Sequence, residues 1–180
     1  MNDFTKSAWE VVKTIVIAGA IVLVIRTVLF QPFLVSGASM EPNIEQSNYL
    51  IIDELTYRFR NPERGEVIIF RYPNGPATFY IKRIVGLPGE QVDVSEGKVK
   101  INNTALNESS YVKGVETYGR VHLTLGPDQY FVMGDNRANS YDSRSWGPLN
   151  KKLIVGRALI RLFPFTEIEI FNEPIYEIKN

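Results

Sequence analysis

The chain has 180 residues, and its 20 Lys and Arg residues balance its 20 Asp and Glu residues, so it carries no formal net charge. This balance provides no basic field for nucleic acid, and we expect no nucleic-acid partner. Cysteine is absent and His122 is the single histidine, which excludes disulfides, thiolate chemistry and a multi-histidine metal site. We therefore expect neither a metal nor a cofactor.

The N-terminal segment 11–30, VVKTIVIAGAIVLVIRTVLF, is nearly all apolar. A helix of this length is about 30 Å long, which matches the hydrocarbon core of a bilayer. Lys6 and Lys13 lie at its start, and positive charge favours the cytoplasmic side. The sequence predicts a single-pass anchor in the plasma membrane over 11–30, with 1–10 as a short cytoplasmic N-terminus and 31–180 as an extracytoplasmic domain.

Two other interpretations of this segment remain. It resembles a cleaved signal peptide, because Ser36-Gly37-Ala38 places small residues as a cleavage site does, although this triplet lies far beyond the uncharged stretch 14–25. A helix buried in a protein core is the second alternative, and apolar residues on all faces argue against it.

After residue 30 the apolar residues recur with a period of two, and turn-forming residues separate them. Many short strands at this spacing predict a mainly β fold, an antiparallel barrel or sandwich. Residues 91–130 are predicted to form a hairpin or loop insertion, in which 104–120 is polar and weakly patterned. The predicted strands are Tyr49–Ile52, Glu66–Tyr72, Thr78–Val85, Gln91–Val94, Lys98–Ile101, His122–Leu125, Tyr130–Met133, Ile154–Leu162 and Ile168–Phe171.

The first candidate for chemistry is the segment 36–42, SGASMEP, which follows the predicted anchor closely. Glycine and alanine ahead of Ser39 let the backbone turn sharply and approach a substrate. A serine hydroxyl there is suited to attack a carbonyl group, with nearby backbone N–H groups binding the oxyanion. Taken alone, the segment favours an ordinary turn after a helix.

The second candidate is the strand 78–85, in which alternation places Lys82 on one largely apolar face and Arg83 on the other. Burial disfavours the ammonium form of lysine, and a neutral amine is a competent general base. Arginine stays charged, so Arg83 requires an ion-pair partner. The alternative for Lys82 is a stem that lies on apolar surface with its amine in water.

The third candidate is the segment 134–144, GDNRANSYDSR, which is dense in hydroxyl, amide and charged groups. Asp135 or Asp142 is suited to pair Arg83 or Arg144, and Ser140 is suited to orient an amine. A solvated surface loop has the same composition.

Together these segments resemble bacterial type I signal peptidases, particularly the small Gram-positive type. The similarity covers nearly the whole chain in order. It includes the anchor, SGASMEP (36–42), GEVIIF (65–70), YIKRIVGLPGE (80–90) and GDNRANSYDSR (134–144). The resemblance implies an endopeptidase that removes signal peptides from secretory preproteins after small-x-small sites, at the surface of membrane lipid.

The resemblance also assigns roles by position. Ser39 is implied to be the acylating nucleophile, Lys82 the general base, and Ser140 the residue that hydrogen-bonds the lysine amine. Gly37, Ala38 and Met40 are implied to shape the oxyanion hole and the substrate pocket. An ion-paired support beneath the site is implied for Asp135, Asp142, Arg83 and Arg144.

The chain departs from the family pattern at two positions. Gly37 stands where some members have a serine whose hydroxyl completes the oxyanion hole, so a second donor has to come from the backbone or water. Asn43 stands where a threonine is usual after the proline. We also expect Phe33, Leu34 and Met40 to form an apolar surface that dips into lipid.

Two rival functions remain. A self-cleaving repressor with a Ser-Lys peptidase domain would need a DNA-binding module, which the first thirty residues do not supply. A membrane-anchored β domain that only binds peptides or partner proteins would not require Ser39, Lys82 and Ser140 together.

Overall fold

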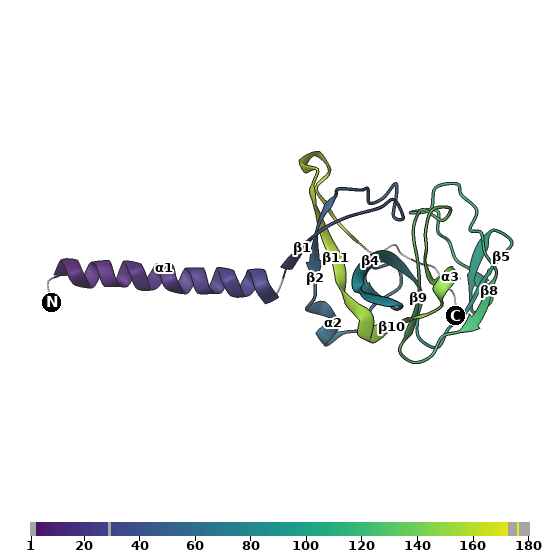
Figure 1. Cartoon of the computed structure of the whole chain (residues 1–180), viewed down its shortest axis with the longest axis horizontal. Helices are drawn as coiled ribbons and strands as arrows, with labels where there is room; N and C mark the ends of the chain where they lie inside the picture. Colours follow the sequence, from purple (N-terminus) through teal and green to yellow (C-terminus); the bar gives the residue numbers. More distant parts are fainter. Residues whose placement is uncertain (1–2, 29, 173–175, 177–180) are drawn as a thin grey trace.

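Alternating apolar residues build two antiparallel β-sheets, which follow one long N-terminal helix (Figure 1). This computed structural model describes residues 3–28, 30–172 and 176. The predicted mainly β, antiparallel fold is confirmed. Every predicted strand overlaps a strand of the structure, with ends that differ by a few residues.

The larger sheet carries the candidate catalytic strand in its middle. Its order is β1 (Phe30–Leu34), β2 (Tyr49–Asp53), β11 (Ile154–Phe163), β3 (Val67–Tyr72), β4 (Gly75–Gly86), β9 (Gln129–Met133) and β10 (Leu149–Asn150), and β12 (Glu169–Ile170) pairs with β11.

The smaller sheet lies within the predicted insertion 91–130. Its order is β7 (Thr104–Ala105), β6 (Lys98–Ile101), β5 (Gln91–Ser95) and β8 (Val121–Thr124). Figure 1 shows β5 and β8 at the end of the molecule opposite the long helix. The segment 106–120 joins β7 to β8 without further strands.

The long helix α1 spans Asp3–Val28 and projects from the strand-rich part of the chain (Figure 1). The predicted helix bounds 11–30 are wrong at both ends, because the helix starts earlier and Phe30 begins β1. Among the described residues, no helix combines the length and apolar character that crossing a bilayer requires. The anchor remains a prediction, and part of its sequence, Leu29, lies outside the described residues.

Short helices complete the chain and escaped the sequence analysis because each is a single turn. These are α2 (Thr56–Phe59), α3 (Ser143–Trp146), and the 3₁₀ turns Lys151–Leu153 and Phe165–Glu167. Helix α3 begins where Asp142 accepts a hydrogen bond from the backbone N–H of Arg144, an N-cap contact.

Three buried clusters form the core. One joins the two sheets through residues such as Val85, Val92 and Phe131, and a second lies between β3, β4 and β9. The third includes Met40, Ile44 and other apolar residues of β2 and β3, so it packs directly under the segment that carries Ser39. The turn that carries the candidate nucleophile is therefore supported by a packed apolar core.

Candidate active site

Strand β4 carries Lys82 from the surface into the interior. Its residues 76–79 are exposed, whereas 82–86 are buried, and Lys82 is 4% exposed. Its Nζ atom lies 2.7 Å from Ser39 Oγ and 2.9 Å from the carbonyl oxygen of Ile81. Burial lowers the pKa of Lys82 from 10.5 to about 8, although the charges of Asp142 and Asp135 act in the opposite direction. Burial thus increases the fraction of neutral amine, the form that accepts a proton, relative to an ordinary lysine.

The segment with Ser39 is a turn held from below. Met40 and Ile44 are fully buried, and the backbone N–H of Ile44 donates to the carbonyl of Met40 at 3.0 Å. Gly37 has a φ of +95°, a conformation that favours glycine. The prediction that Met40 dips into lipid is wrong, because the residue is 1% exposed and packs in the core. Its part in shaping the substrate pocket stays a prediction.

The backbone N–H of Ser39 has no hydrogen-bond partner among the described residues. A free N–H group on the nucleophile itself is available to an oxyanion that forms on the attacked carbonyl. Position 37 is a glycine and offers no side-chain hydroxyl as a second donor.

An apolar groove of about 400 Å³ leads to the Ser39–Lys82 pair. Gly37 and Ala38 line it, as predicted from the sequence, and so do Phe33 and Leu34 from β1. Strand β4 contributes residues 78–82, among them Lys82. Tyr141 from the 134–144 segment adds an aromatic wall.

The segment 134–144 holds the Ser39 turn through main-chain carbonyls. The backbone N–H of Asn136 donates to the carbonyl of Ser39 and its side-chain Nδ2 donates to that of Ala38, both at 3.0 Å. This role of Asn136 was not predicted. Its only signal in the sequence was an amide beside Asp135 in a polar segment.

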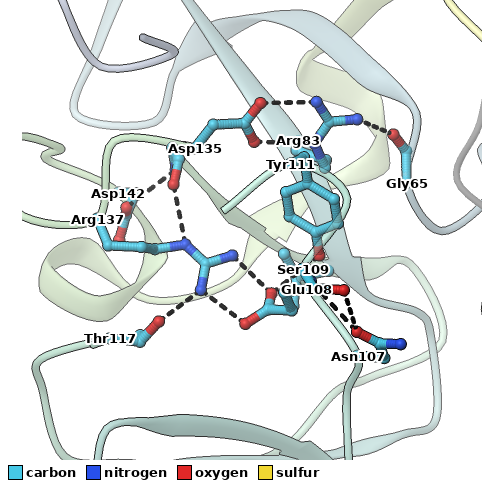
Figure 2. A network of polar contacts seen from close by, with 12 residues as sticks. Gly65, Arg83, Asn107, Glu108, Ser109, Tyr111, Thr117, Asp135, Arg137 and Asp142 are labelled. Atoms are coloured by element: carbon cyan, nitrogen blue, oxygen red, sulfur yellow. Dashed lines mark hydrogen bonds and ion pairs between the residues drawn. The ribbon is translucent and has the colours of Figure 1, made fainter. Parts of the chain in front are cut away.

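A buried ion pair lies next to Lys82. Arg83 donates from Nε to Asp135 Oδ1 at 2.8 Å and from Nη2 to Asp135 Oδ2 at 2.6 Å, and its guanidinium also lies over the ring of Tyr111. Figure 2 shows this pair, with Arg83 reaching on to the carbonyl of Gly65. Asn43 donates to the same carboxylate at 2.8 Å. This residue is one of the two that depart from the family pattern, and here it links the Ser39 turn to the ion pair.

A second ion pair joins Asp142 to Arg144. Arg144 donates from Nε to Asp142 Oδ1 and from Nη2 to Oδ2, each at 2.8 Å. Burial raises the pKa of Asp142, but the hydrogen bond and the charge of Arg144 outweigh burial, and the pKa falls below its usual value. The carboxylate therefore stays ionised and fixes the end of the 134–144 segment.

Ser140 differs from its predicted role. Its Oγ atom is buried near the Ser39 turn, lies on the side of the Asp142 carboxylate and makes no hydrogen bond to the amine of Lys82. The amine of Lys82 is held instead by Ser39 Oγ and by the carbonyl of Ile81.

Three further residues, Arg137, Glu108 and Thr117, extend these polar contacts around the site. None of them was predicted from the sequence. Arg137 is 2% exposed and contacts Glu108 and Thr117, both in the polar stretch 104–120 (Figure 2). The available signal in the sequence was that Arg137 is a third arginine in or near the predicted site, and no carboxylate had been assigned to it.

A larger cavity of about 450 Å³ is lined by charged groups, including Glu66, Arg83 and Arg161. Its charges are engaged with one another: Arg161 Nη2, for example, donates to Glu169 Oε2 at 2.7 Å. It contains neither Ser39 nor Lys82, so the smaller apolar groove is the better candidate for substrate binding.

A serine hydroxyl in contact with a buried lysine amine, at the end of an apolar groove, is suited to a hydrolase that attacks a carbonyl group with serine. The comparison with protein families agrees with this class. Residues 8–163 match the family described as "Signal peptidase, peptidase S26".

Known relatives extend the match. The chain is 36% identical to a probable signal peptidase I-2 of Synechocystis, over 93% of this chain and 79% of that protein. It is 35% identical to signal peptidase I S of Bacillus subtilis, over 93% and 95% of the two chains. A crystal structure of a signal peptidase I from Enterococcus faecalis aligns with 54% of this chain and 97% of its own, at 29% identity and a TM-score of 0.49. The chain belongs to the signal peptidase family, peptidase S26, and it is a serine peptidase that removes signal peptides.

Proposed function

We propose that the chain cleaves signal peptides through an acyl-enzyme, with Ser39 as the nucleophile and Lys82 as the general base. Ser39 Oγ attacks the carbonyl carbon of the scissile peptide bond while Lys82 Nζ takes the hydroxyl proton. The C–N bond breaks, and Lys82 passes the proton to the leaving amine, which is the new N-terminus of the mature protein.

The second half of the reaction uses the same two groups. Lys82 removes a proton from water, the resulting hydroxide attacks the ester carbonyl on Ser39, and the signal peptide leaves as a carboxylic acid that releases its remaining proton to solvent. Lys82 returns its proton to Ser39 Oγ, so both residues end in their starting state. The free N–H of Ser39 stabilises the oxyanion in both halves.

The observation that supports this mechanism is the 2.7 Å contact between Lys82 Nζ and Ser39 Oγ at a site where burial lowers the pKa of the lysine. We would incubate the purified full chain in detergent with a secretory preprotein and sequence the new N-terminus. Ser39→Ala and Lys82→Met are expected to be silent. Ser145→Ala and Lys98→Met, which change exposed residues away from the groove, are expected to cut normally. Cutting by Ser39→Ala would contradict the mechanism.

We propose that the groove accepts small residues one and three places before the cut. An extended peptide places alternate side chains on the same side, so these two residues both point into the groove. The groove is mainly apolar, and Val35, Ala38 and Ile81 line it together with Ser39. Preproteins with leucine in place of alanine at either position are expected to be cut at least about tenfold more slowly, and equal rates would contradict the proposal.

We further propose that α1 anchors the chain in the plasma membrane, N-terminus inside, with secretory preproteins as partners at the outer surface. Val11, Val12, Ile15, Val16 and Ile17 are each at least 50% exposed, and such a surface requires an apolar environment. The helix leads within two residues to β1, whose Leu34 lines the groove, so an anchor there places the groove close to the bilayer.

The anchor is testable independently of catalysis. In sealed membrane vesicles the chain is expected to resist extraction at alkaline pH, and added protease is expected to reach residues 31–180 only from the extracytoplasmic side. Release at alkaline pH, or digestion from the cytoplasmic side, would contradict the anchor without affecting the proposed chemistry.

A further inference from the structure

Arg137 joins the catalytic segment to the insertion that carries the smaller sheet. Its side chain is 1% exposed. The Nε atom donates to the carbonyl of Gly134 at 3.0 Å, within the catalytic segment itself. Its outer nitrogens turn to the insertion: Nη1 donates to Glu108 Oε2 at 2.8 Å and to Thr117 Oγ1 at 2.6 Å, and Nη2 donates to Glu108 Oε1 at 2.5 Å (Figure 2).

Glu108 is the carboxylate that balances this buried charge. An arginine in a protein interior stays protonated, so it must be paired or hydrogen-bonded there. Glu108 binds it with both oxygens, and the planar bidentate contact fixes the orientation of the guanidinium as well as its charge. Tyr111 holds the carboxylate in turn, by donating from its hydroxyl to Glu108 Oε1 at 2.9 Å.

The 134–137 turn, which Arg137 fixes, also holds the segment that carries Ser39. Gly134 and Arg137 bracket Asn136, whose backbone N–H and side chain hold the carbonyls of Ser39 and Ala38. The backbone of this turn thus connects the guanidinium of Arg137 to the segment that sets the distance between Ser39 Oγ and Lys82 Nζ.

A second contact supports the same connection. Arg144 Nη1 donates to the carbonyl of Tyr118 and Nη2 donates to the carbonyl of Arg137, both at 2.9 Å. The stretch 104–120 therefore touches the catalytic segment at two places, through Glu108 and Thr117 and through Tyr118.

We propose that Glu108 is a positioning residue for catalysis: by holding Arg137 it fixes the 134–137 turn, and this turn holds Ser39 in line with Lys82. The inference rests on the proposed function of Ser39 and Lys82 and assigns a role to the insertion in the same reaction. Glu108 does not touch the substrate, and it acts through Arg137 and Asn136.

Steady-state cleavage of a preprotein by the full chain tests this role. Glu108→Gln keeps the size of the side chain and one acceptor oxygen but removes the charge. We expect kcat to fall by about tenfold to a hundredfold, because small displacements of a reacting group cost this much. KM should change by less than about twofold, because uniform substrate binding is untouched. Glu116→Gln, an exposed carboxylate in the same stretch, is the matched control and should leave both constants unchanged.

A paired variant separates positioning from simple loss of stability. Glu108→Gln combined with Arg137→Gln removes the unpaired buried charge, so the melting temperature should return toward that of the parent. The turn still lacks its anchor, so kcat should stay low. Recovery of kcat together with the melting temperature would show that the pair is structural only, and an unchanged kcat in Glu108→Gln would also overturn the proposal.

Ser39→Ala in the same assay keeps this test distinct from that of the proposed function. Residual cutting by Ser39→Ala contradicts the mechanism itself. A silent Ser39→Ala beside a fully active Glu108→Gln contradicts only the positioning role of Glu108.

Discussion

Gly134 packs its bare Cα against the main-chain carbonyl of Ser39. A Cβ atom at this position would lie 2.4 Å from the carbonyl oxygen of Ser39 and 2.6 Å from the Cβ atom of Ser140. Real side chains do not approach backbone so closely, so the Ser39 turn and the 134–144 segment meet only because position 134 has no side chain. The same carbonyl accepts the hydrogen bond of Asn136.

Gly134→Ala is therefore expected to push the Ser39 turn away from the catalytic segment. We expect preprotein cleavage to fall by about a hundredfold, since displacement of a nucleophile by a fraction of an ångström has effects of this size. Overpacking should also lower the free energy of unfolding, by about 1–3 kcal/mol. Cleavage rates and denaturant unfolding measure the two effects.

Gly126→Ala is the control for this substitution. A Cβ there would meet mainly the end of the Gln129 side chain, at 3.1 Å, and that end can move aside. It should cut at nearly the parent rate. A Gly134→Ala variant as active as Gly126→Ala would mean that the close approach at Ser39 does not matter for catalysis.

The rate of cleavage should depend on pH through Lys82. The neutral amine is the base, and the pKa of Lys82 is lowered to about 8, so kcat/KM should rise with pH and level off above that value. Asp142 and Asp135 raise this pKa through their charges. Asp142→Asn should therefore move the midpoint to lower pH, even where it reduces the maximum rate.

The pH profile of the preprotein reaction checks this directly. His122, the single histidine of the chain, lies on β8 and does not line the groove, so His122→Gln is the control substitution. A midpoint that follows His122→Gln and ignores Asp142→Asn would remove Lys82 from the role of base.

The fold could be predicted where a local sequence pattern alone determines the secondary structure. The period-two alternation in 78–85 correctly placed Lys82 within a strand and beside Tyr80 on one face, because alternation depends on the strand alone. Strand β1 was missed because Pro32 lies within it, although its place at the edge of the sheet tolerates a residue that cannot donate a hydrogen bond.

The site was less predictable where contacts depend on distant segments. Charge balance predicted that Arg83 is ion-paired, with Asp135 or Asp142 as the candidate partner, and the structure pairs it with Asp135. Glu108 is 29 residues from Arg137, in a stretch without periodicity, so no local pattern identifies the pair. The burial of Met40 was missed for the same reason, because the core beneath the Ser39 turn is assembled from β2, β3 and β11.

Removal of one partner of the Arg83–Asp135 pair should strongly destabilise the protein. The Asp135 side chain is fully buried and Arg83 is 8% exposed, so Asp135→Asn leaves a positive charge in the interior without its carboxylate. We expect the free energy of unfolding to fall by about 3–5 kcal/mol. Asp93→Asn, which removes the carboxylate beside the exposed His122, should leave it nearly unchanged. Similar small losses in both variants would contradict a tightly coupled pair at Arg83.

The buried Lys82 should lower the free energy of unfolding at neutral pH. The unfolded chain holds the lysine proton up to pH 10.5, whereas the folded chain releases it at about 8, so the unfolded state binds more protons between these values. The stability of the parent therefore rises as pH increases from 8 to 10.5, and below 8 the full penalty applies. At about 1.4 kcal/mol per pKa unit the penalty is about 3 kcal/mol.

Lys82→Met tests this cost, because methionine has a similar shape and does not titrate. Its lost hydrogen bonds to Ser39 and Ile81 offset part of the gain at every pH, each by about 1 kcal/mol. The variant should be the more stable chain near pH 7, and its advantage over the parent should shrink by about 3 kcal/mol as pH rises to 10.5. Denaturant unfolding of both full chains across this range measures the difference. A difference that stays constant with pH would mean that Lys82 keeps its ordinary pKa, and that the buried amine is not prepared to act as a base.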